Sequence, residues 1–237
     1  MNTTIEVISA EHLALAFIPA FMVIGIIFFW RLHFGQAIYA LIRMLIQLLL
    51  IGYFLAFIFS SDSIWVISAV LVIMVLFSSW IALNNLPGKR IFLFKYAVLA
   101  VLLGGGSTLF LVIIGVLNIQ PWYSPRFLIP LAGMIFANSM NSISLAAERL
   151  DAEIPRNQSF NDARNIAFHA SLIPIINSLF AVGLVSLPGM MTGQILSGVS
   201  PFIAARYQIM VMCMIFGSAG MSSACFLVLA KTFFKKS

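Results

Sequence analysis

The chain has 237 residues, of which 62% are apolar and 8% are charged, and its formal net charge is +6. Soluble domains carry about 25% charged residues, so this composition excludes a water-soluble globular enzyme. The basic residues do not form one tract interleaved with aromatic residues, so the positive charge does not indicate nucleic-acid binding. The sequence predicts an all-α, polytopic membrane protein that interacts with the lipid bilayer and not with nucleic acid.

Apolar runs separated by polar breaks predict about seven transmembrane helices, because a helix needs about 20 apolar residues to cross about 30 Å of hydrocarbon. The predicted spans are Leu13–Trp30, Ala37–Phe59, Ile64–Leu83, Tyr96–Leu117, Phe127–Ala147, Ile166–Leu187 and Tyr207–Ala230. The connections between them are short, so residues 1–237 are expected to form a single transmembrane domain.

The distribution of Lys and Arg predicts the orientation, because basic residues gather on the inner side of a membrane. An outer N terminus and an inner C terminus place most basic residues inside. The inner set is Arg31, Lys89, Arg90, Lys95, Arg149, Arg156, Arg164, Lys231, Lys235 and Lys236, and the outer set is Arg126 and Arg206.

Capping signals mark where two helices begin. Ser159 followed by Asp162 has the spacing of a capping box at the end of the long inner connection. Ser200 can cap a helix with Pro201 in its first turn. The stretch before it is too polar for lipid and too apolar for a free loop, which predicts an outer re-entrant or interface-lying segment. Its marker residues are Pro188, Gly189, Thr192, Gln194 and Gly198.

Several polar side chains interrupt the apolar runs and are candidates for a substrate pathway. Arg43 lies inside the second span with Gln47 one turn later, and a charge at that depth must meet protein or water. It lines a pathway or ties two helices together, and the sequence leaves both open. The fifth span holds the densest polar set, Asn138, Ser139, Asn141, Ser142 and Ser144, and ends in Glu148. Asn138, Asn141 and Glu148 share one face, and Asn177 in the sixth span can join them. Interhelical hydrogen bonding is the alternative role for this polar set.

Enzyme and cofactor signatures are missing from the chain. Gly88-Lys89-Arg90 resembles the end of a phosphate-binding loop, but Arg90 stands where Ser or Thr is required. His12, His33 and His169 lie far apart and have no metal-ligand spacing. We therefore expect no enzymatic activity, no nucleotide site and no cofactor in this chain, and no metal-binding residues are predicted.

Two blocks in the second half of the chain closely resemble a known family. The first block contains Pro121-Trp122-Tyr123, Pro125-Arg126, Leu128-Ile129-Pro130-Leu131, Gly133-Met134-Ile135, Met140-Asn141 and Glu148-Arg149-Leu150. The second contains Ile173-Pro174, Ile176-Asn177-Ser178, the run from Val182 to Leu196, Gly198-Val199-Ser200-Pro201 and Arg206-Tyr207-Gln208. These blocks resemble the Fet-type family of ABC permeases, the iron-export membrane subunits of bacteria whose plant relatives are aluminium-tolerance membrane proteins.

The resemblance implies a multi-pass permease subunit of the bacterial inner membrane that exports iron or another metal ion. It implies two partners, a separate ATP-binding subunit that binds the ATP and a second copy of the permease. The docking surface for the ATP-binding subunit is expected in the connection after the fifth span. Its predicted residues are Arg149, Asp151, Glu153, Arg156, Asp162 and Arg164.

One departure from the family pattern keeps two alternatives open. The segment between Leu150 and Ile173 is shorter than is usual in the family and contains Pro155. A membrane scaffold that binds a partner without moving solute is therefore the first alternative. An ion-driven secondary transporter is the second, and it is disfavoured because no carboxylate lies mid-membrane in any span to carry a proton.

Overall fold

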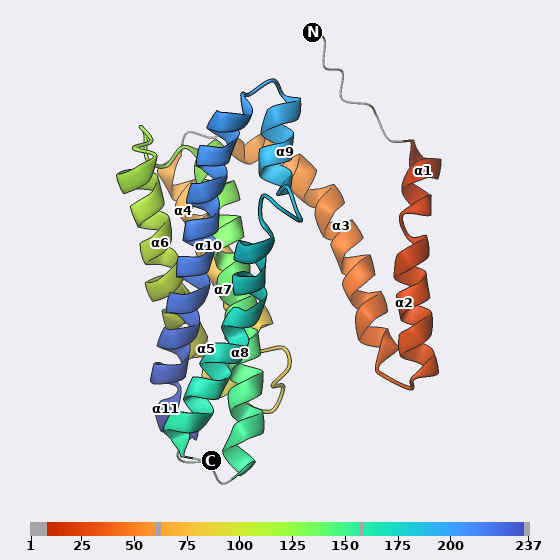
Figure 1. The fold of residues 1–237 in the computed structure, drawn as a ribbon, viewed down its shortest axis with the longest axis vertical. Coiled ribbons are helices and arrows are strands. Elements are labelled where there is room, and N and C mark those ends of the chain that lie inside the picture. Colours follow the sequence, from red (N-terminus) through yellow and green to blue (C-terminus); the bar gives the residue numbers. More distant parts are fainter. Residues whose placement is uncertain (1–8, 60–62, 157–158, 235–237) are drawn as a thin grey trace. The chain divides into compact units, whose positions relative to one another are not determined.

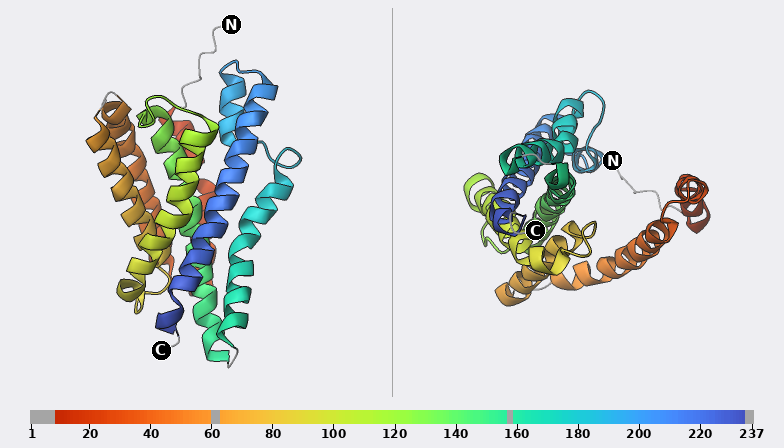
Figure 2. Two further views of the ribbon diagram at one scale, coloured as in Figure 1. Left: turned by 90° about the vertical axis from the view of Figure 1, so that its left-hand side faces the viewer. Right: turned by 90° about the horizontal axis from the view of Figure 1, so that it is seen from below.

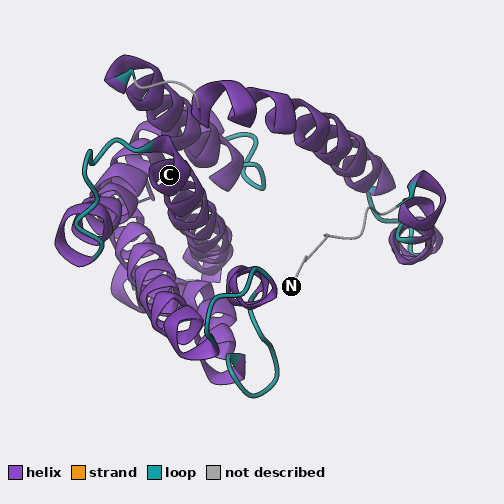
Figure 3. Ribbon diagram, turned by 90° about the horizontal axis from the view of Figure 1, so that it is seen from above, coloured by secondary structure: helices purple, strands orange, loops and turns teal. Residues whose placement is uncertain are grey.

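The computed structural model describes residues 9–59, 63–156 and 159–234. Over these ranges every regular element is a helix and none is a strand (Figure 3). The all-α prediction is therefore confirmed. The chain divides into two compact units, residues 1–61 and residues 62–237, and each is described by itself. That 1–237 forms a single transmembrane domain stays a prediction.

The first unit is a helical hairpin preceded by a short helix. It contains α1 (Ala10–Leu15), α2 (Ile18–Phe29) and α3 (Phe34–Phe59). Arg31 turns the chain between α2 and α3 with a positive φ of 56°. The rings of Phe28 and Phe34 meet edge to face across this turn, with centroids 5.4 Å apart.

The second unit is a bundle in which long helices run alternately up and down (Figures 1 and 2). Its elements are α4 (Ile64–Ala82), α5 (Arg90–Ala100), η1 (Val101–Gly106), α6 (Ser107–Phe110), η2 (Leu111–Val116), α7 (Pro125–Glu153), η3 (Ile154–Arg156), α8 (Phe160–Ala181), α9 (Gly189–Leu196), α10 (Pro201–Leu229) and α11 (Lys231–Phe234). The elements from α5 to η2 follow one another without a break, and η1 and η2 are π-helical turns within this rod.

The two ends of this bundle differ in composition, because most of its charged residues lie at one end. We call the "charged end" the one formed by residues 83–89, the end of α7, the start of α8 and α11. The "α9 end" is formed by residues 117–124 and 182–200 (Figure 1). Lys235 and Lys236, which contributed to the predicted orientation, lie outside the described residues.

Both predicted helix starts are confirmed. Ser159 is the N-cap of α8, where its Oγ accepts a hydrogen bond from the Asp162 backbone N over 3.2 Å. The same hydroxyl donates to the Asp162 carboxylate over 2.6 Å. Ser200 caps α10 by accepting from the Ile203 amide, and Pro201 occupies the first turn.

The core of the bundle is built around α7, which packs against α4, α8, α10 and η1. Ile135, Ile143 and Leu150 on α7 are fully buried, as are Leu93 on α5 and Phe226 on α10. Their spacing on α7 follows one helical face, so the sequence itself determines which side of α7 faces the core.

Six helices among the described residues are long and apolar enough to cross a membrane. They are Glu11–Phe29, Phe34–Leu55, Ile64–Ala82, Arg90–Val116, Pro125–Arg156 and Pro201–Leu229. The sixth predicted span falls on α8, which is helical but is not in this set. Polar residues in its first two turns, including Asp162, Arg164 and Asn165, lower its hydropathy. Pro174 does not end α8, which continues through it to Ala181.

Candidate functional site

A group of buried serines links α7 to its neighbours at the centre of the second unit. Ser222 on α10 donates a hydrogen bond to Ser139 on α7, with 3.0 Å between the two hydroxyl oxygens. Ser139 in turn donates to the Ser218 carbonyl oxygen over 3.4 Å. Ser142 donates to the carbonyl oxygen of Ser171 on α8 over 3.5 Å. The bundle centre therefore holds polar groups that are satisfied within the protein, as a low-dielectric interior requires.

Glycines of η1 allow the rod from α5 to η2 to approach this group closely. A Cβ added to Gly104 would lie 2.4 Å from the Ser222 backbone N. A Cβ added to Gly105 would lie 3.2 Å from the Ser139 hydroxyl. Gly104 and Gly105 thus permit close helix approach, whereas an added Cβ at Gly106 or Gly217 would meet little or nothing.

The predicted pathway residues of α7 and α8 lie outside this serine group. Asn138 is half-buried and donates from its amide Nδ2 to the Met134 carbonyl oxygen of its own helix over 2.8 Å. Asn141 on α7 and Asn177 on α8 are exposed in the single chain. The structure therefore gives α7 two polar faces, with the serines inward and the asparagines toward the surface.

Arg43 and Gln47 belong to the other unit, on α3. Arg43 is half-buried and Gln47 is exposed. Among the described residues neither side chain makes a hydrogen bond or an ion pair. The pathway role and the helix-tying role of Arg43 therefore both stay predictions.

Glu148 shares a helical face with Asn138 and Asn141 in the sequence, but the structure places it at the charged end of the bundle. It accepts a hydrogen bond from the amide of Asn85 over 2.9 Å. One turn later Asp151 pairs with Lys89. Both partners lie in the connection between α4 and α5, so two polar contacts fasten this connection to the end of α7.

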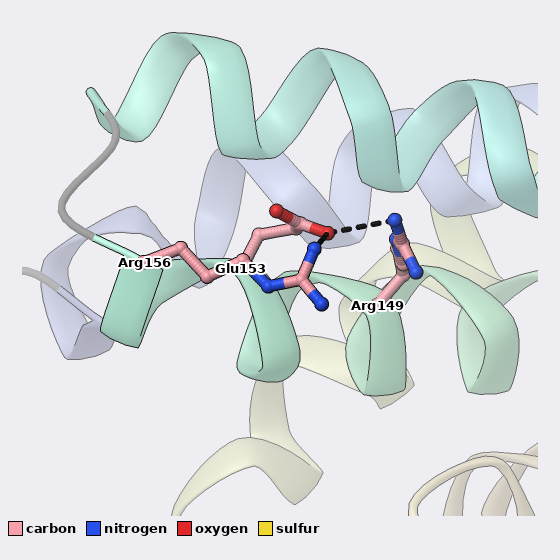
Figure 4. A network of polar contacts seen from close by, with 3 residues as sticks. All are labelled: Arg149, Glu153 and Arg156. Atoms are coloured by element: carbon pink, nitrogen blue, oxygen red, sulfur yellow. Dashed lines mark hydrogen bonds and ion pairs between the residues drawn. The ribbon is translucent and has the colours of Figure 1, made fainter.

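Glu153 forms a buried clasp at the same end (Figure 4). Its side chain is 1% exposed, and one carboxylate oxygen, Oε1, accepts from both Arg149 at 2.7 Å and Arg156 at 3.0 Å. The two arginines are 44% and 59% exposed. Figure 4 shows the carboxylate between the two guanidinium groups, directed from α7 toward α8. Glu153 thus holds two surface arginines in place and offers little surface of its own.

The remaining predicted docking residues lie at the start of α8. Asp162 is exposed and occupied by the N-cap hydrogen bond of Ser159. Arg164 is half-buried and donates to the amide oxygen of Asn165. The structure therefore brings Arg149, Arg156, Asp162 and Arg164 to the surface of one end, and pairs Asp151 and Glu153 within the chain.

The segment predicted to be re-entrant contains α9. Pro188 is the N-cap residue of this eight-residue helix, Gly189 begins it, and the hydroxyl of Thr192 donates to the Pro188 carbonyl oxygen. Gly198 then turns the chain with a φ of +90°, a conformation that favours glycine. The helix packs against α10. Gln194 is half-buried, and its amide oxygen makes no hydrogen bond among the described residues.

Ser139 and Ser142 belong to the polar set of the fifth span, and the structure shows them in interhelical hydrogen bonds, one of the two roles predicted for that set. The sequence interpretation missed their partners Ser171, Ser218 and Ser222, and it missed the role of Asn85. The available signal was the spacing of Ser218 and Ser222, four residues apart on the same face of the last span. Among the described residues no cluster of three or more His, Cys, Asp or Glu side chains is suited to hold a metal ion.

Over the residues that the structure describes, the chain is all-helical, with six apolar helices, a group of hydrogen-bonded serines at the bundle centre and charged residues gathered at one end. These features define a multi-pass membrane protein. The chain belongs to the family UPF0014, described as an uncharacterised protein family, whose sequence pattern matches residues 10–234.

Members of the family from bacteria and plants resemble this chain over most of its length. The UPF0014 membrane protein slr1647 from Synechocystis is 42% identical over 198 residues, which cover 76% of each chain. The Arabidopsis thaliana protein ALUMINUM SENSITIVE 3 is 36% identical over 80% of this chain and 73% of its own length. The Escherichia coli protein named probable iron export permease protein FetB is 34% identical over 80% of this chain and 78% of its own length. No solved structure matches the chain. The predicted membership in the family of these permease and aluminium-related proteins is confirmed.

Proposed function

We propose that this chain is the transmembrane permease subunit of an ATP-driven exporter in the bacterial inner membrane, with iron or another metal ion as substrate. The observation that carries the proposal is the 34% identity to the protein named probable iron export permease FetB, over 209 residues. In this proposal the chain binds no nucleotide, and ATP is bound and hydrolysed by a separate ATP-binding subunit.

The proposal includes a seventh span formed by α8. This helix has 22 residues, long enough to rise about 33 Å at about 1.5 Å per residue. It packs along α7 and α10, which are both apolar enough to cross the membrane (Figure 2). A helix that packs against two membrane spans shares their depth, and protein contacts compensate for its polar residues.

The orientation in this proposal has the N terminus outside and the C terminus inside. It is supported by the concentration of Lys89, Arg149, Arg156 and Lys231 at the charged end, against Arg126 and Arg206 near the α9 end. Cysteine labelling tests it in a background where Cys213 and Cys225 are alanine. Gln120→Cys should react with a membrane-impermeant maleimide on intact cells, and Pro155→Cys should react only after permeabilisation. The reverse pattern would contradict the orientation.

The charged end is the proposed docking surface for the ATP-binding subunit. Exposed Arg149, Arg156 and Asp162 lie there at the junction of two long helices, where a rigid-body displacement would be transmitted along both. Because Glu153 is buried, its role in docking is to position the two arginines. The proposed substrate path uses Asn138, Asn141 and Asn177, whose surface positions would be covered by a second copy of the chain.

Transport by reconstituted protein tests the function. Vesicles that contain the chain and its ATP-binding subunit should move Fe²⁺ only when ATP is present, and an ATP-binding subunit that cannot hydrolyse ATP should give no movement. The docking surface is tested by R149E/R156E, which should abolish co-purification of the ATP-binding subunit. Arg206→Glu, a charge reversal near the α9 end, is the matched control and should leave co-purification intact.

The same experiment separates the alternatives. A complex that forms but moves no metal ion would support the scaffold. Metal movement that persists without the ATP-binding subunit and stops when the ion gradient is collapsed would support the secondary transporter.

A further inference from the structure

A cavity of about 630 Å³ lies near the α9 end of the second unit, between α7, α9 and α10. Its walls are mostly apolar, with Phe127 and Met134 from α7, Met190 from α9, and Ile203 from α10. The cavity is separate from the buried serines and from the charged end, so nothing in the proposed transport function requires it.

One wall carries a buried acceptor that the protein leaves unsatisfied. The amide oxygen Oε1 of Gln194 is inaccessible to solvent and has no hydrogen-bond partner among the described residues. Leaving such a buried acceptor unpaired destabilises the protein, because its hydrogen bond to water is lost and not replaced. Rotation of the Gln194 side chain would turn this oxygen toward the cavity, where a hydrogen bond from a bound molecule would satisfy it.

The charged residue that lines the cavity determines whether an anion or a cation can bind there. Arg126 is the only charged side chain among the described residues that line it, and within those residues Arg126 makes no ion pair. A fixed guanidinium repels metal cations and binds phosphate through paired N–H donors. The cavity is therefore suited to an anion and unsuited to the proposed metal substrate.

The position of the cavity indicates a lipid as the source of that anion. Arg126 lies in the first turn of α7, at the start of a candidate membrane span, where lipid headgroups are found. Met134 lies eight residues further along, about 12 Å deeper at about 1.5 Å per residue. A charged edge that leads to an apolar interior matches a phosphate followed by an acyl chain.

We propose that this cavity binds one anionic phospholipid whose headgroup carries a hydroxyl, as in phosphatidylglycerol. The phosphate contacts Arg126, a headgroup hydroxyl donates to the Gln194 amide oxygen, and an acyl chain lies against Phe127 and Met134. The lipid site does not depend on the proposed transport function, so either proposal can be contradicted while the other remains valid.

Native mass spectrometry of the full chain in detergent tests the site with three lipids that have identical acyl chains. Phosphatidylglycerol has a net negative charge and a hydroxyl donor, and phosphatidylmethanol has the net negative charge alone. Phosphatidylcholine has no hydroxyl donor, and its choline cation cancels the phosphate charge. We expect phosphatidylglycerol to bind at least fivefold more tightly than phosphatidylmethanol, and phosphatidylmethanol more tightly than phosphatidylcholine. Equal binding of the first two lipids would overturn the role of Gln194.

Variants assign the two polar contacts. Gln194→Leu should bind phosphatidylglycerol and phosphatidylmethanol equally, whereas Arg126→Gln should weaken both at least tenfold. Arg206→Gln removes a charge on the first turns of α10 that does not line the cavity, and should change binding less than twofold. A loss in Arg206→Gln equal to that in Arg126→Gln would show general surface electrostatics and overturn the site.

Thermal unfolding tests the unsatisfied acceptor separately from lipid binding. Gln194→Leu should raise the thermal midpoint of the lipid-free protein, because it removes the unsatisfied acceptor, and Gln194→Met serves if the leucine variant does not fold.

Competition with a soluble headgroup tests whether the ligand is a lipid. Glycerol 3-phosphate should fail to displace the lipid. Full displacement by that soluble headgroup would mean a site for free phosphate esters and would contradict the lipid assignment.

Discussion

The hydroxyl groups of Ser222 and Ser139 meet at 3.0 Å across the centre of the bundle, and this contact joins α10 to α7. The pair lies where the backbone of η1 comes closest to α10, because Gly104 has no side chain to hold the helices apart. Three chain segments far apart in sequence are thus fixed to one another through small residues.

Gly104→Ala should destabilise the protein by about 1–3 kcal/mol, because the added methyl would overlap the Ser222 backbone and force the helices apart. The midpoint of thermal unfolding in detergent measures the effect. Gly106→Ala is the matched control, since nothing lies within 4 Å of its added Cβ. A helical glycine replaced by alanine without a clash is neutral or stabilising by about 0.5–1 kcal/mol. Equal midpoints for the two variants would contradict the close approach.

Glu153→Gln should destabilise the charged end by about 1–3 kcal/mol, because it removes the charge that holds two arginines and buries an amide N–H without a partner. Arg156→Gln, at a 59% exposed position, should stay within about 0.5 kcal/mol of the wild type. Chemical denaturation in mixed micelles compares them. If both variants lose the same stability, Glu153 is not the centre of the clasp.

Ser159→Ala should destabilise the start of α8 by about 1 kcal/mol, because the N-cap acceptor of the Asp162 amide is lost. Hydrogen exchange of the first turn of α8 should accelerate, while exchange at the end of α8 stays unchanged. Ser159→Asp keeps an acceptor and should restore protection. Faster exchange in Ser159→Asp as well would show that the hydroxyl acts other than as a cap.

Reversing one charge of the pair Lys89 and Asp151 should cost about 1 kcal/mol, since two like charges would then face each other between the α4–α5 connection and the end of α7. The double reversal K89D/D151K should recover most of the loss at low salt. Unfolding midpoints of the four proteins form a double-mutant cycle. A coupling of zero would mean that the pair is only a surface contact.

Much of the fold could be predicted from the sequence, because a membrane imposes strong constraints on composition. Apolar length defines the spans, and Ser159, Ser200 and Pro201 mark helix starts through local hydrogen bonding that needs no tertiary context. The predicted span Ile166–Leu187 falls on α8, whose polar first turns lower its hydropathy, so that its role as a span stays a prediction. Its packing against α7 and α10 depends on tertiary contacts that composition does not encode.

The candidate site was harder to predict because it depends on which face of each helix turns inward. Asn138 and Ser139 are adjacent in sequence, yet one bonds its own helix and the other bonds across to α10. Glu153 reads as one more surface charge, but its position relative to Arg149 and Arg156 buries it. Charge alone does not distinguish a docking residue from the residue that positions it.

The hairpin of α2 and α3 has a consequence for how the protein is made. Within the first unit α2 and α3 pack against each other, and the rings of Phe28 and Phe34 meet at the turn between them. All their backbone hydrogen bonds except those at the ends are closed within each helix, which is the condition for stability in lipid. This first hairpin is therefore equipped to insert into the bilayer while the ribosome is still translating the rest of the chain.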